Sequence, residues 1–219
     1  MMLKAILFDM DGVIIDSEDY IRDAAIEMFK EMGQQVKPED FIPFIGAGEN
    51  KYIGGVAEKY QLTIDIQKAK KRTYEIYDQM VKDSIQPLPG TDYFLALCQN
   101  YNLRTALVTS ADRTKIEINL NALNMNQETF DVYVSGEDVK HLKPDPSIFI
   151  KASKLLGLNP ADCLVIEDSV NGIRAAKKAG CQCIALKTSF PEEKLGEADY
   201  IYDNLSTIPE NIIHHLTVE

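Results

Sequence analysis

The chain has 219 residues, 45% of them hydrophobic and 26% charged, a balance that excludes global disorder, a collagen-like sequence and a coiled-coil rod. Its formal net charge of -11 disfavours nucleic acid and anionic membrane surfaces as partners. No run approaches the roughly 18 apolar residues that a membrane span needs, and no signal peptide is evident.

The first predicted element is a strand, the short apolar run Leu3 to Phe8. The next part of the chain lacks convincing strands and contains long amphipathic stretches at residues 20–32, 52–60 and 66–81. The segment Gln86-Pro-Leu-Pro-Gly90 then marks a boundary before the strand patterns resume. We therefore expect a discontinuous core, residues 1–16 and 86–219, interrupted by a helical insertion, residues 17–85.

Strand and helix patterns alternate through the rest of the chain. Continuous apolar runs predict further strands at residues 104–109, 132–135, 163–167, 182–186 and 199–202. Apolar residues at helical spacing predict helices at residues 111–124, 146–156 and 169–179. Continuous rather than alternating hydrophobicity is typical of parallel strands covered on both faces. The order predicts an α/β fold with a doubly wound, Rossmann-like parallel sheet.

A pair of acidic residues, Asp9 and Asp11, follows the first predicted strand directly, and Gly12 permits the turn after it. Ligands of open α/β sheets bind beyond the carboxyl ends of the strands, so the pair is placed where chemistry occurs. Solvated loop acids are the plain alternative. A calcium loop is disfavoured because Val13 occupies the position of its third oxygen ligand.

Polar residues also follow two later strands and occupy one loop. Thr109 and Ser110 end the second strand, where a hydroxyl and backbone N–H groups can hold a phosphate oxygen, or where Ser110 can cap a helix. Lys143 lies in a loop stiffened by two prolines. Glu167 and Asp168 end the fourth strand, as a metal site or as a helix cap.

The charges of these residues indicate a missing cation. One cleft would hold four carboxylates against the single ammonium of Lys143. Such a cluster would repel itself and any anion. A bound Mg²⁺ would relieve most of that excess, and Mg²⁺ prefers a few carboxylates together with substrate phosphate. The sequence therefore predicts a divalent metal, Mg²⁺, and a small phosphorylated ligand.

The segments 8–13, 108–110, 143–149 and 166–172, in this order and spacing, resemble the motifs of the haloacid dehalogenase-like phosphohydrolase superfamily. The resemblance is to its β-phosphoglucomutase-like and sugar-phosphatase branch. It implies that residues 17–85 form a helical cap domain that sets substrate specificity. It also implies a Mg²⁺-dependent phosphatase that hydrolyses a small phosphorylated metabolite, such as a sugar or polyol phosphate, through an aspartyl-phosphate.

The same resemblance implies a role for each motif residue. Asp9 would be the nucleophile, and Asp11 the general acid and base. Thr109 would hold the transferring phosphoryl group, and Lys143 would neutralise charge on it and on Asp9. The implied metal ligands are Asp9, Asp11 through its backbone carbonyl, Glu167 and Asp168.

Substrate choice is expected to lie in the cap. Lys51 and Arg72 are the candidate substrate-binding residues there, with Ser110 in the core. A solvated helix face is the plain alternative for the two basic residues. The loop at Glu49 departs from the arginine-bearing cap loop typical of β-phosphoglucomutase, which weighs against mutase activity.

Two other functions remain open from the sequence. One is a hexose-phosphate mutase of the β-phosphoglucomutase type. The other is a non-catalytic module that accepts or binds phosphate, although a general acid at Asp11 serves turnover rather than a stable phosphorylated state. The four cysteines form no C-x-x-C pair, which favours reduced, buried thiols in a cytoplasmic protein.

Overall fold

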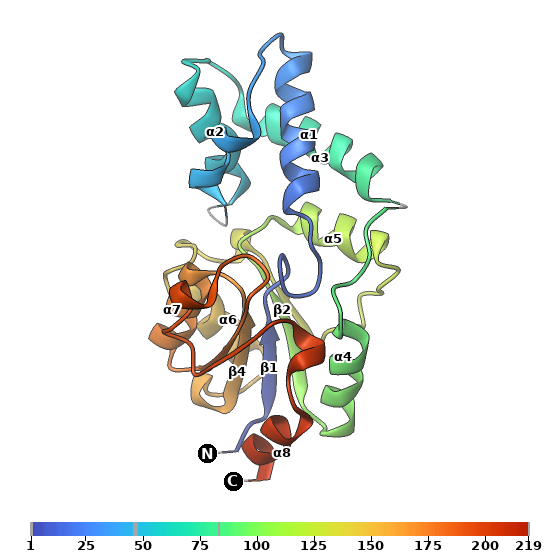
Figure 1. The fold of residues 1–219 in the computed structure, drawn as a ribbon, viewed down its shortest axis with the longest axis vertical. Coiled ribbons are helices and arrows are strands. Elements are labelled where there is room, and N and C mark those ends of the chain that lie inside the picture. Colours follow the sequence, from blue (N-terminus) through green and yellow to red (C-terminus); the bar gives the residue numbers. More distant parts are fainter. Residues whose placement is uncertain (1, 46–47, 83, 219) are drawn as a thin grey trace.

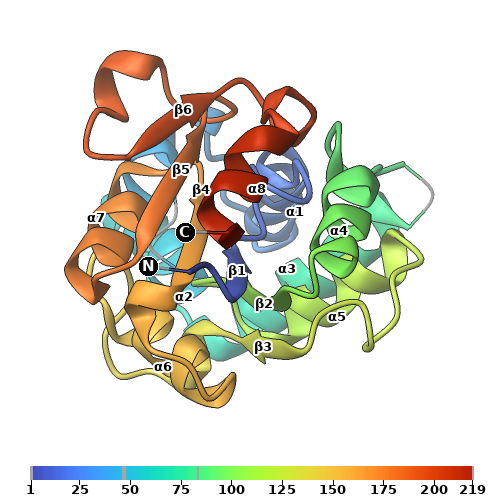
Figure 2. The same cartoon turned by 90° about the horizontal axis from the view of Figure 1, so that it is seen from below.

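The computed structural model describes residues 2–45, 48–82 and 84–218. Its core is a six-stranded sheet in the order β3-β2-β1-β4-β5-β6, in which every neighbouring pair is parallel (Figure 2). The strands are β1 (Ala5–Phe8), β2 (Arg104–Val108), β3 (Val132–Val134), β4 (Cys163–Glu167), β5 (Gln182–Leu186) and β6 (Tyr200–Tyr202). This is the doubly wound order that the alternating pattern predicts.

Helices cover both faces of the sheet. One face carries α6 (Ser147–Leu155) and α7 (Val170–Ala179), and the other carries α4 (Thr91–Asn100), α5 (Arg113–Ala122) and α8 (Glu210–Val218) (Figure 2). Successive residues of β1 alternate between the faces, because Ala5 and Leu7 pack in one hydrophobic cluster and Ile6 and Phe8 in the other. Burial on both sides explains why these strands are continuously apolar.

The insertion is helical, as predicted. Helices α1 (Glu18–Glu31), α2 (Glu49–Lys59) and α3 (Ile66–Val81) form a cap at the end of the molecule opposite the chain termini (Figure 1). Buried Ile21 and Tyr77 of the cap belong to the same hydrophobic cluster as Phe8 and Ile116 of the core. The cap is therefore packed on the core as well as linked to it, while the exact limits at residues 17 and 85 stay a prediction.

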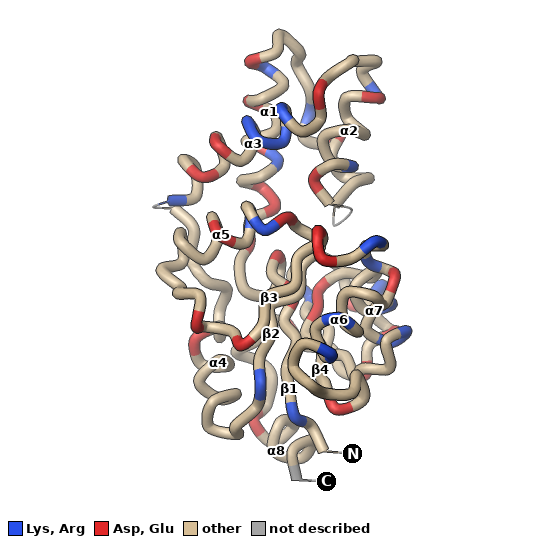
Figure 3. The backbone as a smooth tube through the Cα atoms, turned by 180° about the vertical axis from the view of Figure 1, so that it is seen from behind, with Lys and Arg blue, Asp and Glu red and all other residues tan. Residues whose placement is uncertain are grey.

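Charged residues are spread along the cap rather than gathered by sign. Lys, Arg, Asp and Glu positions are interspersed over α1, α2 and α3 (Figure 3). Within the described ranges, no helix combines the length and the apolar character that crossing a membrane requires. The expectation of buried thiols is confirmed, since Cys98, Cys163, Cys181 and Cys183 are all free and buried.

Candidate active site

The predicted core residues meet at the carboxyl ends of the central strands, beneath the cap. They line a cavity of about 300 Å³ between core and cap. The sequence-predicted residues that line it are Asp9, Asp11, Thr109, Ser110, Lys143, Glu167 and Asp168. Strands β1, β2 and β4 are neighbours in the sheet, so residues far apart in the chain come together at one edge.

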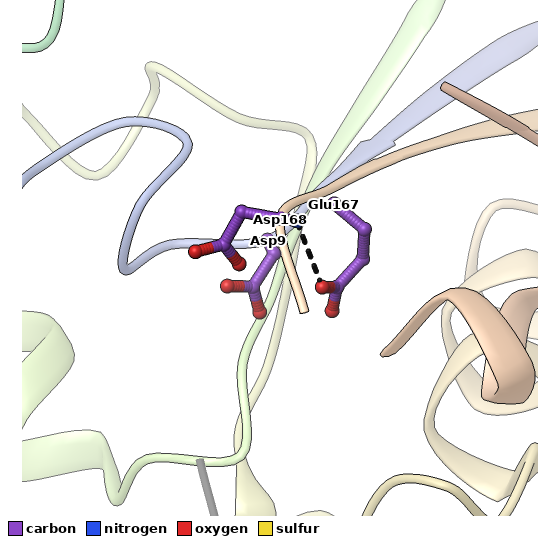
Figure 4. Close-up of side chains that lie close together, drawn as sticks. All are labelled: Asp9, Glu167 and Asp168. Carbon is purple, nitrogen blue, oxygen red and sulfur yellow. Dashed lines mark hydrogen bonds between the residues drawn. The ribbon is translucent and has the colours of Figure 1, made fainter. Parts of the chain in front are cut away.

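Three carboxylates form the floor of the cavity. One oxygen from each of Asp9, Glu167 and Asp168 lies within 4.8 Å of the others, and all three residues are buried (Figure 4). Burial raises the pKa of Asp9 to about 7, with Lys143 opposing the shift and Glu167 adding to it. Burial also raises the pKa of Asp168, and the charges of Glu167 and Asp9 add to that shift. A cluster of crowded, dehydrated carboxylate oxygens fits a divalent metal ion.

Glu167 is held from several sides. Its Oε1 accepts a hydrogen bond from Lys143 Nζ at 2.6 Å. Its Oε2 accepts from the backbone N–H groups of Asp168 at 3.0 Å (Figure 4) and Ser169 at 2.9 Å. The first turn of α7 also closes over it, since a Cβ on Gly172 would lie 1.8 Å from Oε1. Only glycine fits at that position without moving the carboxylate.

Lys143 supplies the positive charge beside the cluster. Its buried ammonium contacts Asp9 Oδ1 and Glu167 Oε1, and it donates to the carbonyl of Val108 at 3.3 Å. Burial opposes the charged form, but Asp9 and Glu167 outweigh it and raise the pKa of Lys143. The ammonium therefore stays charged at neutral pH and can orient the Asp9 carboxylate.

The carboxylate of Asp11 is not part of the three-carboxylate cluster. Its two oxygens accept from Ser17 Oγ and from Lys115 Nζ, the latter at 2.9 Å. The turn after it depends on Gly12, which has a φ of +78° and lies so close to Asp168 that a Cβ would meet Oδ2 at 1.9 Å. Asp11 is thus placed beside the cluster, and a metal contact through its backbone carbonyl stays a prediction.

Lys115 is a site residue that the sequence analysis missed. It lies on α5 with only 3% of its side chain exposed, and it faces Glu49 of the cap at 3.8 Å as well as Asp11. In the sequence, a lysine beside Ile116 looks like the solvated edge of an amphipathic helix. No local pattern shows that the cap lies over this part of α5.

Thr109 and Ser110 lie at the end of β2 as predicted. Thr109 is buried, and its Oγ1 accepts a hydrogen bond from the backbone N–H of Ala111 at 3.1 Å. Ser110 Oγ is buried and has no hydrogen-bond partner among the described residues. Asp112, rather than Ser110, occupies the N-cap position of α5. The hydroxyl of Ser110 is therefore available to a ligand.

The two basic cap candidates lie away from the carboxylates. The guanidinium of Arg72 pairs with Glu31 at 2.8 Å and Glu75 at 2.9 Å on the cap surface, and Arg72 does not line the cavity. Lys51 is exposed and lines a neighbouring cavity instead. Arg72 lies outside the cavity because its side chain extends from α3 to Glu31 of α1 rather than toward the core.

Residues 6–186 match the family of haloacid dehalogenase-like hydrolases. The chain belongs to this family. It is 42% identical over 216 residues to protein SUPPRESSOR OF QUENCHING 1, chloroplastic, of Arabidopsis thaliana, covering 96% of this chain and 20% of that protein. The family inferred from the motifs is thereby confirmed, while a cytoplasmic location stays a prediction.

Two further similarities come from proteins of matching size. A phosphorylated carbohydrates phosphatase of Thermotoga maritima is 29% identical over 182 residues, covering 83% of this chain and 84% of that protein. CbbY of Rhodobacter sphaeroides, solved as a mutant with xylulose-(1,5)bisphosphate, superposes with a TM-score of 0.84 at 27% identity, covering 94% of this chain and 96% of that chain.

Proposed function

We propose that the chain is a Mg²⁺-dependent phosphatase that hydrolyses a small phosphorylated metabolite, a sugar or polyol phosphate, through an aspartyl-phosphate. The observation that carries the proposal is the buried cluster of Asp9, Glu167 and Asp168 with the ammonium of Lys143 against it. The names of the Thermotoga phosphatase and of the CbbY complex support a phosphorylated sugar as substrate. A cavity of about 300 Å³ suits a small metabolite.

The chain's own residues can supply each step. Lys143 orients the Asp9 carboxylate, whose oxygen attacks phosphorus while the bond from phosphorus to the leaving oxygen breaks. Asp11 in its protonated form would give its proton to the leaving oxygen, and the resulting carboxylate would take a proton from the water that attacks the aspartyl-phosphate. That attack breaks the bond between phosphorus and Asp9, which restores the carboxylate. Thr109 lies at the end of β2, within reach of the phosphoryl group.

A divalent cation has a natural place in this arrangement. Asp9, Glu167 and Asp168 would hold it, with the backbone carbonyl of Asp11. The ion would neutralise negative charge on the phosphate group of the substrate. Glu167 is already fixed by Lys143 and by backbone N–H groups, so its carboxylate would take part without reorientation.

The test is release of inorganic phosphate from sugar, polyol and nucleotide phosphates with Mg²⁺. We expect EDTA to abolish release and Asp9→Asn to reduce it by about a thousandfold or more, because the nucleophile is lost. Asp92→Asn, at an exposed aspartate of α4, is the matched control and should behave as the wild type.

Release that persists in Asp9→Asn would contradict the mechanism. Interconversion of hexose phosphates without phosphate release would favour the mutase instead. Stable phosphorylation of Asp9 without turnover would favour the non-catalytic module.

A further inference from the structure

The cap side of the cavity is acidic and apolar. Its described cap residues are Glu18, Ile21, Phe44, Ile45, Gly48, Glu49 and Tyr52, and none of these is Lys or Arg. A ligand whose phosphate lies against Asp9 would therefore extend its other end toward carboxylates. The core lines the same cavity with Lys115, which faces Asp11 and Glu49, and with the exposed Lys194, so a second phosphate that reached the cap carboxylates would meet repulsion.

Among the cap residues that line this cavity, Glu49 carries a buried side-chain oxygen without a hydrogen-bond partner in the described part of the chain. It opens α2, and its side chain is 9% exposed. Its Oε1 lies 3.8 Å from Lys115 Nζ, beyond hydrogen-bond distance, and its Oε2 has no hydrogen-bond partner among the described residues. Burial raises the pKa of Glu49 to about 7 although Lys115 opposes the shift. A buried acceptor without a donor is costly, so a ligand donor at this place would stabilise it.

The backbone keeps Glu49 close to the core. Gly48, the residue before it, has a φ of +83°, and a Cβ there would lie 2.9 Å from a methyl group of Leu142 and 3.6 Å from the carbonyl of Ser110. Glu49 and Ser110 line the same two cavities, and each carries a buried side-chain oxygen that lacks a partner within the described ranges. A ligand hydroxyl can donate one hydrogen bond and accept another, which matches a carboxylate and a serine hydroxyl.

Of the polar cap side chains that line this cavity besides Glu49, Glu18 and Tyr52 pair with each other. The hydroxyl of Tyr52 donates to Glu18 Oε1 at 2.9 Å. In the neighbouring cavity, Lys70 is engaged by Asp112, which leaves Lys51 at the exposed rim. Because Glu49 lines both cavities, a phosphate that approached Lys51 from the site would have to pass a carboxylate.

We infer that Glu49 is a specificity-determining residue, which accepts a hydrogen bond from a hydroxyl of a sugar or polyol monophosphate and disfavours bisphosphates. This inference rests on the proposed phosphatase function. It separates this chain from the CbbY structure, whose ligand carries two phosphates.

The kinetic test compares three kinds of phosphate ester. The hydroxyl-bearing monophosphates are glycerol 3-phosphate, ribose 5-phosphate and fructose 1-phosphate, phenyl phosphate is the ester without a hydroxyl, and fructose 1,6-bisphosphate is the probe with a second phosphate group. We expect Glu49→Ala to lower kcat/KM at least tenfold more for the best hydroxyl-bearing ester than for phenyl phosphate. Glu49→Gln, whose amide oxygen still accepts, should show a smaller loss of that preference.

The wild type should also prefer fructose 1-phosphate to fructose 1,6-bisphosphate. Glu58→Ala, which removes an exposed carboxylate from the same helix, is the matched control and should leave both preferences unchanged. Equal losses on all esters in Glu49→Ala would overturn the inference. So would a wild-type preference for the bisphosphate that Lys51→Gln removes.

A binding measurement keeps this inference separate from the proposed function. Calorimetric titration with fructose 1-phosphate and Mg²⁺ would compare Asp9→Asn with the double variant Asp9→Asn/Glu49→Ala, neither of which needs to turn over. We expect at least tenfold weaker binding in the double variant and a much smaller change for inorganic phosphate. Equal affinities would overturn the role of Glu49, whereas absence of phosphate release from the wild type would overturn only the phosphatase.

Discussion

Lys115 joins the catalytic centre to the cap through one ammonium group. It is buried between Asp11 of the core and Glu49 of the cap, and these carboxylates raise its pKa although burial lowers it. Its positive charge offsets the buried carboxylate of Glu49 and the half-buried carboxylate of Asp11. Lys115 contacts the carboxylate of Asp11 at 2.9 Å, so the proton transfer that we propose for Asp11 would depend on this residue.

Replacing Lys115 with Met should destabilise the protein by about 3–5 kcal/mol, because it leaves the buried carboxylate of Glu49 and the half-buried carboxylate of Asp11 without a cation. Urea unfolding measures the loss. Lys177→Met is the matched control, since Lys177 pairs with Asp199 at 2.7 Å on the surface and its loss should cost no more than about 1 kcal/mol. Adding Glu49→Gln to Lys115→Met should recover part of the stability. Similar losses in both lysine variants would contradict the role of Lys115.

At the scale of elements, the start of α7 shapes the carboxylate cluster. Ser169 caps the helix by accepting from the N–H of Gly172 at 3.0 Å, and this turn brings Gly172 against Glu167. In an exposed helix, Ala would replace Gly at a gain of roughly 0.5–1 kcal/mol. Here the added methyl group would collide with the Glu167 carboxylate.

Gly172→Ala should therefore weaken Mg²⁺ binding by about tenfold, because displacing a held ligand group typically costs that much affinity. The measurement is the rise in Tm as Mg²⁺ is added. Gly54→Ala in α2 is the control, because its Cβ would find an ordinary contact of 3.6 Å with Ile66 of α3. Gly54→Ala should keep the Mg²⁺ response, and an unchanged response in Gly172→Ala would refute the steric argument.

A second element, the loop between α1 and α2, is fastened by Asp40. Burial alone would raise its pKa, but hydrogen bonds from Lys59, from the hydroxyl of Tyr60 at 2.6 Å and from the backbone N–H of Lys37 at 2.8 Å lower the pKa of Asp40 to about 2. A carboxyl with a lowered folded-state pKa stabilises the fold above its unfolded pKa of about 3.9. That stabilisation is lost as the pH falls through about 4 toward about 2.

Asp40→Asn should lower the free energy of unfolding by about 1–3 kcal/mol at neutral pH, because charged hydrogen bonds are replaced by weaker ones. The difference from the wild type should shrink as the pH falls below about 4. Urea unfolding at a series of pH values measures it, with Glu39→Gln at the exposed neighbouring position as control. A deficit that stays constant with pH would show that the charge of Asp40 is not responsible.

The fold and the motif residues could largely be predicted from the sequence, because both depend on short patterns of apolar and polar residues along the chain. Strands β4 and β5 have the predicted bounds, since continuous apolar runs are bordered there by polar residues or glycine. Helix α4 was missed because it follows Gly90 rather than a Ser or Asp cap and its apolar residues are crowded together. Lys115 could not be found because its burial depends on how the cap packs on α5.

At the scale of the whole molecule, one hydrophobic cluster runs from the sheet into the cap. Phe8 of β1 packs edge-to-face with Phe94 at 6.0 Å and Phe130 at 5.7 Å between ring centroids, and the same cluster includes Tyr77 of α3. Tyr77 also donates to Asn119 of α5 at 2.5 Å. Cap and core are thus stabilised together.

The two ends of the described chain meet on the far side of the core from the cap. The backbone N–H of Leu3 donates to the carbonyl of Leu216 at 2.7 Å, and both ends lie at the pole opposite α1, α2 and α3 (Figure 1). The two chain ends therefore lie close together, on the side of the core away from the active-site cavity. Additional sequence attached to either end would leave the cavity free. A circular permutation that joins the two ends and opens the chain at another surface loop would also leave it free.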